Sequence, residues 1–350
     1  MGNLQPRVLG LVLACVALAA QAPGPILIDT HNDVPLRVVK GFDIGQRAID
    51  GHTDLPRLRE GGVGAVFFSV YVGAEYVKGN HSAHRALDMF DAVLAGVVAR
   101  SPNDFRLART ADDIEAAQRQ GKVAALIGVE GGHAIEDSLG LLRDFYTLGA
   151  RYMTLTHVNT NHWADSSGDI GNRKAKHHNG LTEFGRQVIA EMNRLGMIVD
   201  ISHVSDKTFW DVLAASQAPV FASHSSCRAL CDVPRNMTDD MIRALAKKGG
   251  IIQINFNPGF LTLRKSPPAN LDDVVAHIDH AVKIGGIDGV GIGSDFDGID
   301  QTPVGLEDVS RFPNLTRALR SQGYSAEDIR KIYGGNTLRL MRAVEKAARH

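Results

Sequence analysis

Short apolar runs alternate with longer amphipathic stretches along almost the whole chain after residue 25, and this alternation limits the fold more than any other feature. Between the runs, apolar residues recur every three or four positions, which is typical of helices. Repeated strand–helix units predict a parallel sheet, because consecutive parallel strands need a crossover between them. Eight runs have the length and composition of buried strands: Ile26–His31, Val63–Val72, Val123–Val129, Arg151–His157, Met197–His203, Val220–His224, Ile251–Phe256 and Gly289–Asp295.

Eight strand–helix units predict a fold of the α/β class, a single (β/α)8 barrel of the TIM type with insertions. No Pro/Ser-rich linker divides residues 23–350, so we expect one barrel domain there. The longest polar interruption, Asn161–Asn179, follows the fourth strand and is a candidate lid. The clearest predicted helices are Ala86–Ala99, Leu139–Leu148, Glu183–Leu195, Asp206–Ala215, Asp239–Lys248 and Leu271–Ile284.

The first 22 residues differ from the rest of the chain. Arg7 is their only charged side chain, and the apolar run Val8–Ala20 is followed closely by Pro23 and Pro25. This run is too short for the roughly 20 apolar residues that a membrane-spanning helix needs. We therefore predict a signal peptide over residues 1–22 and an exported protein, periplasmic or secreted, with no stable membrane span in its mature form.

Composition argues against several classes of protein. The chain has 38 Lys and Arg against 39 Asp and Glu, and no long basic run, so nucleic acid is not an expected partner. Three cysteines in 350 residues are too few for a disulfide framework or a zinc ribbon. Any metal site must therefore be made of histidines and carboxylates.

Residues suited to metal binding or acid–base chemistry lie at the carboxyl ends of the predicted strands. In a (β/α)8 barrel these ends meet at one mouth, so side chains from distant parts of the sequence can share one pocket. The residues, in chain order, are His31 and Asp33 at the first strand, Glu130 at the third, His157, His203 and His224 at the fourth, fifth and sixth, and Asp295 at the eighth.

Five of these residues form a candidate metal centre. His31 and Asp33 are two positions apart, so both should point to the same side of a strand. Imidazoles and carboxylates are common zinc ligands, and Glu130 has two oxygens that could bridge two ions. With His203 and His224, the set suffices for two Zn²⁺ ions that each keep a position for water. Alone, each residue is as well explained by a surface, capping or hydrogen-bonding role; five buried together are not.

The remaining histidines do not lie at strand ends. His133 and His162 are close to the predicted mouth, but we assign them no role. The others occur in predicted loops, in helices or at the carboxyl terminus, and we expect them to be exposed to solvent: His52, His81, His84, His177, His178, His277, His280 and His350.

The strand-end residues are embedded in longer motifs. These are Asp29-Thr-His31-Asn-Asp33, Glu130-Gly-Gly132, Tyr152-Met-Thr-Leu-Thr-His157, Gly180-Leu-Thr-Glu-Phe-Gly185, Asp200-Ile-Ser-His203, Ser223-His224-Ser-Ser226, Arg235-Asn236 and Gly293-Ser-Asp295-Phe-Asp-Gly298. With this set the chain resembles, nearly from end to end, the membrane dipeptidase (renal dipeptidase) family of zinc peptidases, which are amidohydrolase-type barrels. Other amidohydrolase branches have His-x-His on the first strand or a modified lysine on the fourth, where this chain has Asp33 and His157.

The resemblance implies a role for each residue. His157 would contact the substrate and stabilise the oxyanion, Arg235 would pair with the substrate's terminal carboxylate, and Asp295 would be the acid/base. The implied reaction is hydrolysis of dipeptides by a metal-bridging hydroxide, in which Asp295 passes the water's proton to the leaving amine. The family's metal-ligand positions are occupied by His31, Asp33, Glu130, His203 and His224, with Glu130 shared by two Zn²⁺ ions.

Two positions depart from the family pattern. Phe260 stands where many relatives have Tyr, so we expect one hydrogen bond to the substrate carboxylate to be missing. Cys231 lies where relatives often have Cys, but its usual partner has no counterpart here; Cys227 could pair with it, or both could stay reduced.

Three questions stay open at this point. Relatives are often dimers, so the resemblance allows a homodimer, although no interface is evident. An amidase that acts on N-acyl amino acids or β-lactam-like amides could use the same metal core. A metal-free barrel could bind peptides without hydrolysing them.

Overall fold

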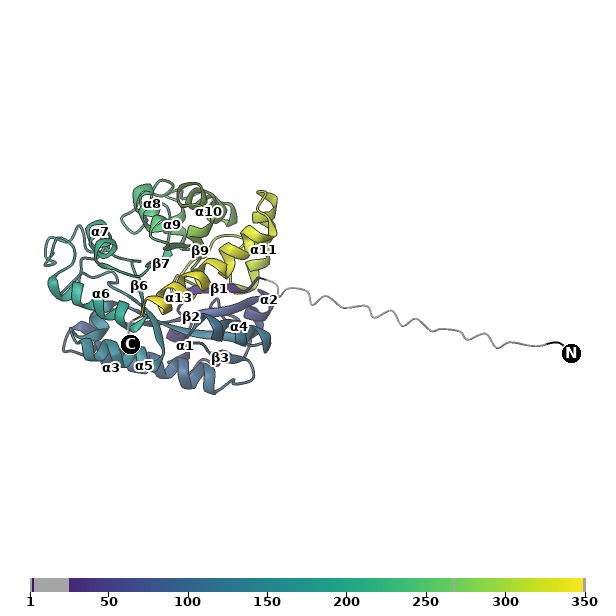
Figure 1. Cartoon of the computed structure of the whole chain (residues 1–350), viewed down its shortest axis with the longest axis horizontal. Helices are drawn as coiled ribbons and strands as arrows, with labels where there is room; N and C mark the ends of the chain where they lie inside the picture. Colours follow the sequence, from purple (N-terminus) through teal and green to yellow (C-terminus); the bar gives the residue numbers. More distant parts are fainter. Residues whose placement is uncertain (1, 3–24, 267, 349–350) are drawn as a thin grey trace.

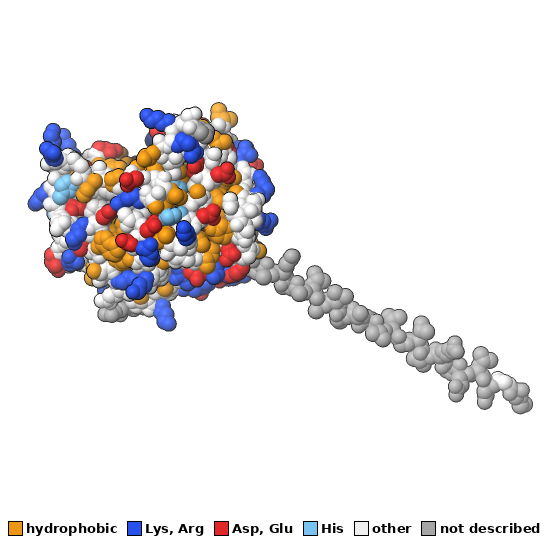
Figure 2. Space-filling view, turned by 90° about the horizontal axis from the view of Figure 1, so that it is seen from above, with side chains coloured by type: hydrophobic (Ala, Val, Ile, Leu, Met, Phe, Trp, Pro, Cys, Tyr) orange, Lys and Arg blue, Asp and Glu red, His pale blue; other side chains and the backbone are white. Residues whose placement is uncertain are grey.

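The structure, a computed structural model, describes residue 2 and residues 25–266 and 268–348. The predicted signal peptide therefore lies outside the described residues, except for Gly2. In the part that the structure describes, no helix is both long and apolar enough to cross a membrane. On the face drawn in Figure 2, basic and acidic side chains are interspersed, with apolar side chains between them.

Nine strands of the described chain form one parallel sheet, surrounded by helices (Figure 1). The short strand β3 (Phe105–Leu107) pairs with Val123–Ala125 of β4, whose later residues, from Ile127 to Glu130, pair with β5. The other eight strands follow one another around the sheet: β1 (Leu27–Asn32), β2 (Val63–Tyr71), β4 (Val123–Glu130), β5 (Ala150–Thr154), β6 (Ile198–Asp200), β7 (Phe221–Ser225), β8 (Ile251–Ile254) and β9 (Val290–Ile292).

Backbone hydrogen bonds join β1 to the segment after β9. Asp295 N donates to His31 O at 3.0 Å, and Asp33 N donates to Phe296 O at 2.8 Å. Asn32 and Phe296 form a parallel bridge at the same place. The eight strands are thus nearly closed, and the predicted (β/α)8 barrel is confirmed. Only β3 lies off the eight-strand path, and three residues are too few to show an alternating pattern.

Helices surround the sheet, and five predicted ones are confirmed to within one residue: α5, α6, α7, α8 and α10. Their first residues follow Ser, Thr or Asn side chains that accept a backbone N–H, as Thr182 does from Gly185 at the start of α6. The prediction Ala86–Ala99 instead corresponds to α3 and a π-helical turn, Leu94–Ala99. The helices are α1 (Pro35–Val38), α2 (Leu55–Glu60), α3 (Ser82–Val93), α4 (Ala111–Arg119), α5 (Leu139–Leu148), α6 (Glu183–Leu195), α7 (Asp206–Ala215), α8 (Asp239–Lys247), α9 (Pro258–Leu261), α10 (Leu271–Gly285), α11 (Phe312–Ser321), α12 (Ala326–Arg330) and α13 (Asn336–Ala347).

Side chains alternate between two apolar clusters. On β2, Val66 and Phe68 pack toward the helices, whereas Phe67 joins a second cluster with Tyr152 and Phe221. In that second cluster, the ring of Tyr152 lies 5.2 Å from Phe67 and 5.3 Å from Phe221. Strands that do not neighbour one another thus meet through their rings, which places this cluster inside the barrel.

Three strands end earlier than their apolar runs predict. β5, β6 and β9 each stop three residues before the site residue that was expected to end them, namely His157, His203 and Asp295. His203 and Asp295 adopt left-handed backbone, with φ of 67° and 66°. This conformation is unfavourable for a side chain with a Cβ, and such residues tend to lie at functional sites. The backbone therefore leaves the sheet before it presents these side chains.

The prediction that His277 is exposed was wrong. This side chain of α10 is 1% exposed: its Nδ1 accepts a hydrogen bond from Cys227 N at 3.0 Å, and its Nε2 donates to Leu261 O at 2.9 Å. Periodicity places it on α10 but does not show that the segment around Cys227 and the end of α9 cover it. Cys227 and Cys231 are both buried and are free cysteines, so they do not form a disulfide with each other.

Candidate metal centre

The candidate site residues meet at the carboxyl ends of the strands, around a cavity of about 300 Å³. Two of them lie directly behind its wall: His31, which is fully buried, and Arg235, which bonds to the backbone of His224. The cavity is lined by Asp33, Glu130, His157, His203, His224 and Asp295, together with Leu36, Tyr71, Val158, Asn257, Phe260 and Gly298. The structure thus brings all eight predicted residues together.

The carboxylate of Glu130 lies at the centre of this group. Its Oε1 is 3.1 Å from His203 Nε2 and 3.3 Å from His224 Nε2. Its Oε2 is 3.5 Å from His31 Nε2. The two oxygens therefore face different imidazoles, the arrangement expected of a carboxylate that two cations share.

His31 and Asp33 point to the same place, as their spacing predicts, with 3.2 Å between His31 Nε2 and Asp33 Oδ2. His203 Nε2 and His224 Nε2 are only 3.0 Å apart. Among the described residues, His31 Nε2 and Asp33 Oδ1 are buried and have no hydrogen-bond partner. Unsatisfied buried donors and acceptors are costly, and convergence of so many lone pairs fits a metal cation.

The charges of these groups are set by their surroundings. Burial would raise the pKa of Glu130, but electrostatic interactions with His31 and His157 and hydrogen bonds from His203 and His224 hold that pKa well below its usual value. Burial, reinforced by other cationic groups, holds the pKa of His203 and His224 well below the usual value for histidine. Their imidazoles are therefore neutral, which is the form that binds metal.

His31 differs from the other two imidazoles. Burial alone would lower its pKa, but Tyr152, Glu130 and Asp33 raise it well above the usual value. The carboxylates thus attract positive charge to the side of the cluster where His31 lies. The raised pKa of His31 is thus a second indication, besides the unpartnered buried atoms, that a cation is favourable there.

Asp295 and His157 lie in the same cluster. Donor atoms of Asp295, His31 and His224 are all within 4.8 Å of one another, and so are those of His157, His203 and Glu130. Distance alone therefore does not separate metal ligands from acid–base groups here. Burial, and the nearby carboxylates Asp33 and Glu130, raise the pKa of Asp295 to about 7, although His31 and a hydrogen bond from Asn255 oppose this.

Arg235 is held against the wall of the cavity. Its Nη1 donates to Ser225 Oγ at 2.6 Å and its Nη2 to His224 O at 2.5 Å. The guanidinium lies 5.5 Å from the ring centre of Phe260, which lines the cavity. Its Nε is buried without a hydrogen-bond partner among the described residues. Burial lowers the pKa of Arg235 to about 10, so it stays charged at neutral pH.

Sequence reasoning assigned no role to several buried polar residues behind the ligands. Tyr152 OH is 2.8 Å from His31 Nδ1 and occupies space that Gly128 leaves, since a Cβ there would lie 1.9 Å from the tyrosine Cζ. Asp200 and Ser223 stand behind His224. For Asp200 and Ser223 the available signal was a polar residue inside an otherwise apolar strand, one to three positions before a candidate ligand.

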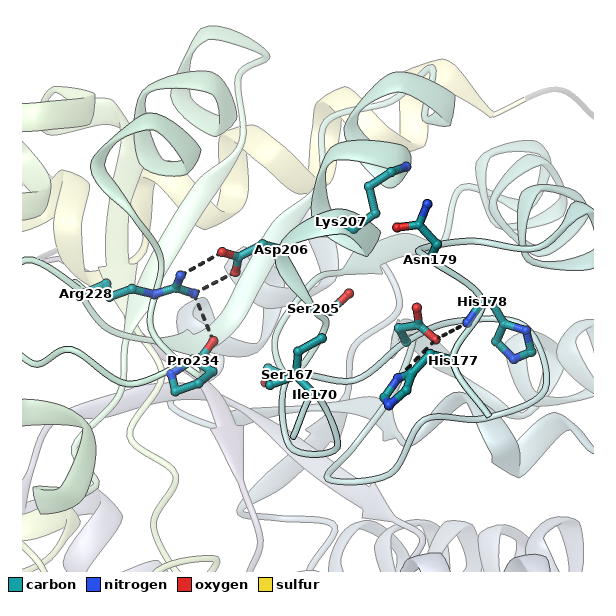
Figure 3. Close-up of a pocket in the computed structure, with 11 residues that line it drawn as sticks. Ser167, Ile170, His177, His178, Asn179, Ser205, Asp206, Lys207, Arg228 and Pro234 are labelled. Carbon is teal, nitrogen blue, oxygen red and sulfur yellow. Dashed lines mark hydrogen bonds and ion pairs between the residues drawn. The ribbon is translucent and has the colours of Figure 1, made fainter. Parts of the chain in front are cut away.

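A larger cavity, of about 720 Å³, lies elsewhere (Figure 3). Its lining comes from the candidate lid, from the start of α7 and from Arg228 and Pro234, and Arg228 forms a double ion pair with Asp206. No predicted metal ligand lines it. Asp165 anchors the candidate lid by accepting hydrogen bonds from His178 N and Gly180 N. No residue of 161–179 lines the smaller cavity, so in this structure the segment does not cover the candidate metal centre.

With this geometry described, comparison with known proteins becomes informative. A family model described as "Membrane dipeptidase (Peptidase family M19)" matches residues 19–350. The chain belongs to this family. Membership agrees with the resemblance noted in the motifs and with a metal-dependent hydrolase fold.

Three relatives illustrate the similarity. The chain is 40% identical to Dipeptidase 3 of Mus musculus over 341 residues, which cover 94% of the chain and 66% of that relative. The chain thus spans about two thirds of that curated relative. A probable dipeptidase, PvdM, from Pseudomonas aeruginosa has a TM-score of 0.86 at 28% identity, with 93% of this chain and 96% of that one covered.

The third relative is a metallo peptidase from Rhodobacter sphaeroides, solved with a phosphinate mimic of the dipeptide L-Ala-D-Ala. It has a TM-score of 0.82 at 30% identity, covering 92% of this chain and 99% of that one. The family's barrel is therefore conserved across the length of both chains.

The raised pKa of Asp295 predicts how pH affects the stability of the protein after its metal is removed. The unfolded chain loses this proton near pH 4, but the folded chain keeps it until about pH 7. The folded chain binds this proton more tightly, so its stability relative to the unfolded chain falls as pH rises from about 4 to 7. We expect the Asp295→Asn change to stabilise the chelator-treated protein more at pH 8 than at pH 4.5, by a few kcal/mol at most. Urea unfolding at both pH values measures this.

Asp113→Asn is a suitable control, because the pKa of Asp113 is shifted in the opposite direction. Burial raises the pKa of Asp113, but hydrogen bonds from Arg109 and Thr110 outweigh this and lower it. Asp113 is therefore ionised at both pH 4.5 and pH 8, so that variant should change stability by nearly the same amount at the two pH values. A pH-independent difference for Asp295→Asn would contradict the assignment of a raised pKa.

Proposed function

We propose that the chain is a zinc-dependent dipeptidase that hydrolyses the peptide bond of dipeptides. The observation that carries this proposal is the position of Glu130, whose two oxygens lie 3.1–3.5 Å from the Nε2 atoms of His31, His203 and His224. A barrel of the membrane dipeptidase family surrounds this group. The dipeptide mimic bound by the Rhodobacter sphaeroides relative supports a dipeptide as the substrate.

The residues that would hold two Zn²⁺ ions share burial and proximity to Glu130. When bound, zinc polarises a carbonyl group and acidifies water enough for hydroxide to form near neutral pH. The lowered pKa values of His203, His224 and Glu130 indicate two neutral imidazoles and an ionised carboxylate, which are the protonation states that this binding needs. The set is His31, Asp33, Glu130, His203 and His224.

Asp295 would accept a proton from the attacking water and pass it to the leaving amine. It lines the cavity, and Asn255 Nδ2 donates to its Oδ2 at 2.9 Å, which fixes the carboxylate. A pKa of about 7 allows the group to hold or release a proton near neutral pH. This role requires Asp295 to lie within hydrogen-bond reach of the water.

His157 would stabilise the developing oxyanion. Burial lowers its pKa despite the nearby Glu130, so the ring is neutral and carries one N–H. The ring packs edge-on against Tyr71, with centres 4.9 Å apart, and both line the cavity. A fixed N–H donor at the reacting carbonyl is the usual means of such stabilisation.

Arg235 would bind the terminal carboxylate of the substrate and limit the site to short peptides. Two of its N–H bonds already hold it to Ser225 and His224, which leaves the other N–H bonds for a ligand. Phe260 offers a ring face here instead of a hydroxyl. A cavity of about 300 Å³ suits a dipeptide better than a long chain.

A direct test compares substrates on zinc-loaded protein. We expect hydrolysis of a panel of dipeptides, with little turnover of the matching N-acetyl amino acids. The two classes share a free carboxylate, but only the dipeptides have a free amino group. The assay is amino acid release, with chelator-treated protein as the blank. Faster turnover of N-acyl amino acids would instead identify the chain as an amidase on the same core.

The Asp295→Asn variant tests the acid–base role. We expect kcat to fall by about 100-fold or more, since proton transfer by a positioned group contributes that much. Zinc content, measured by elemental analysis, should stay close to that of the wild type. Equal loss of zinc and activity would mean that Asp295 is a metal ligand, as its distance to His31 and His224 also permits.

The Arg235→Ala variant tests recognition of the carboxylate. We expect KM for dipeptides to rise about 10- to 100-fold with a smaller change in kcat, because a charge-assisted hydrogen bond is lost. Arg228→Ala is a matched control, since Arg228 is also a partly buried arginine but pairs with Asp206 at the larger cavity. An unchanged KM in Arg235→Ala would remove this residue from the substrate site.

A further inference from the structure

We propose that Asp200 and Ser223 are positioning residues that fix the tautomer and orientation of His224, so that its Nε2 faces the metal. The inference rests on the proposed function, because it treats His224 as a zinc ligand. It concerns two residues that do not themselves reach the cavity: both are fully buried.

Hydrogen-bond contacts link Asp200, Ser223 and His224 in a row. Ser223 Oγ lies 2.6 Å from Asp200 Oδ2 and 2.7 Å from His224 Nδ1. On the other side of the ring, His224 Nε2 lies 3.3 Å from Glu130 Oε1. The imidazole therefore connects a buried hydroxyl with the centre of the candidate metal site.

The number of available protons decides which atom donates in each of these hydrogen bonds. An ionised carboxylate can only accept hydrogen bonds, so the single proton of the Ser223 hydroxyl goes to Asp200. The Ser223 oxygen can then only accept from His224 Nδ1, which must carry the ring proton. The Nε2 atom of a neutral ring is left with its lone pair, as a metal ligand requires.

Asp200, the last residue of β6, is itself held by residues of β5 and β7 and by the turn that follows it. Its Oδ1 accepts from Ser202 N at 3.0 Å and from Ser223 N at 2.8 Å. Its Oδ2 accepts from Thr154 Oγ1 at 2.5 Å as well as from Ser223 Oγ. Four donated hydrogen bonds keep the carboxylate from rotating, so it holds Ser223 in one orientation.

The pair Asp29 and Ser294 resembles the pair Asp200 and Ser223 but does not contact a histidine ring through the serine hydroxyl. Asp29 holds Ser294 through the same two atoms: Ser294 N donates at 2.8 Å and Ser294 Oγ at 2.6 Å. Ser294 also precedes a site residue, Asp295, but its hydroxyl accepts from a backbone N–H, that of Phe296 at 3.1 Å. Of these two serines, Ser223 is the one whose hydroxyl contacts an imidazole.

The test compares two changes that each remove one hydroxyl donor from Asp200 Oδ2. Ser223→Ala also removes the partner of His224 Nδ1, whereas the isosteric Thr154→Val does not touch His224. Zinc affinity is measured by competition with a chromophoric chelator. We expect one bound zinc to be weakened about 10- to 100-fold in Ser223→Ala, the usual effect of losing such a support. Thr154→Val should stay close to the wild type, and Ser223→Thr, which keeps the hydroxyl, should recover most of the affinity.

A spectroscopic readout on the wild type does not depend on any variant's folding. In zinc-loaded, ¹⁵N-histidine-labelled protein, we expect a hydrogen-bonded Nδ1–H of His224 that is protected from exchange with water. Absence of that signal, or equal zinc affinity in Ser223→Ala and Thr154→Val, would overturn the inference. Wild-type protein that binds no zinc would instead overturn the proposed function.

Discussion

Closure of the parallel sheet determines where every candidate site residue lies. The peptide N–H groups of Asp295 and Asp33 bond to the carbonyls of His31 and Phe296, which joins the first strand to the segment after the last. Since all strands of a parallel barrel point the same way, closure gathers their carboxyl ends around one cavity. Without these bonds, residues from the two ends of the chain would have no common site.

Gathering these groups has an electrostatic cost that shapes their chemistry. The Glu130 carboxylate and three imidazoles are buried within a few ångströms of one another, and the pKa values of these groups move in opposite directions. A cation placed among them would satisfy lone pairs that the protein leaves without partners. The same burial raises the pKa of Asp295 to about 7, so the environment that would favour a metal would also suit the proposed proton transfer.

A layer of buried carboxylates and hydroxyls stabilises the cluster from behind. Asp200 binds Ser223 on the neighbouring strand β7, Asp29 binds Ser294 just after β9, and Tyr152 supports His31. These bonds connect strands as well as orienting ligands, so the stability of the barrel and the geometry of the site depend on the same contacts. This explains why polar residues interrupt otherwise apolar strands at these positions.

Much of this arrangement could be predicted from local pattern. Period-two and period-3.6 apolar repeats identified eight strands and the main helices, because burial on one or both faces imposes those periods. His31, Glu130 and His224 were correctly expected at strand ends. The pattern failed where contacts between distant segments decide: β3 is defined by its pairing with β4, and His277 is covered by the segment around Cys227 and the end of α9.

The sequence by itself therefore determined the barrel, the family and the set of residues that could bind metal, since these depend on side-chain chemistry and on periodicity along the chain. The tertiary structure alone decided that β5, β6 and β9 stop three residues early, and that left-handed turns present His203 and Asp295. It also decided which nitrogen of His224 faces Glu130, because a ring's orientation depends on partners from other strands. Such partners are close in space but distant in the chain, so no local pattern records them.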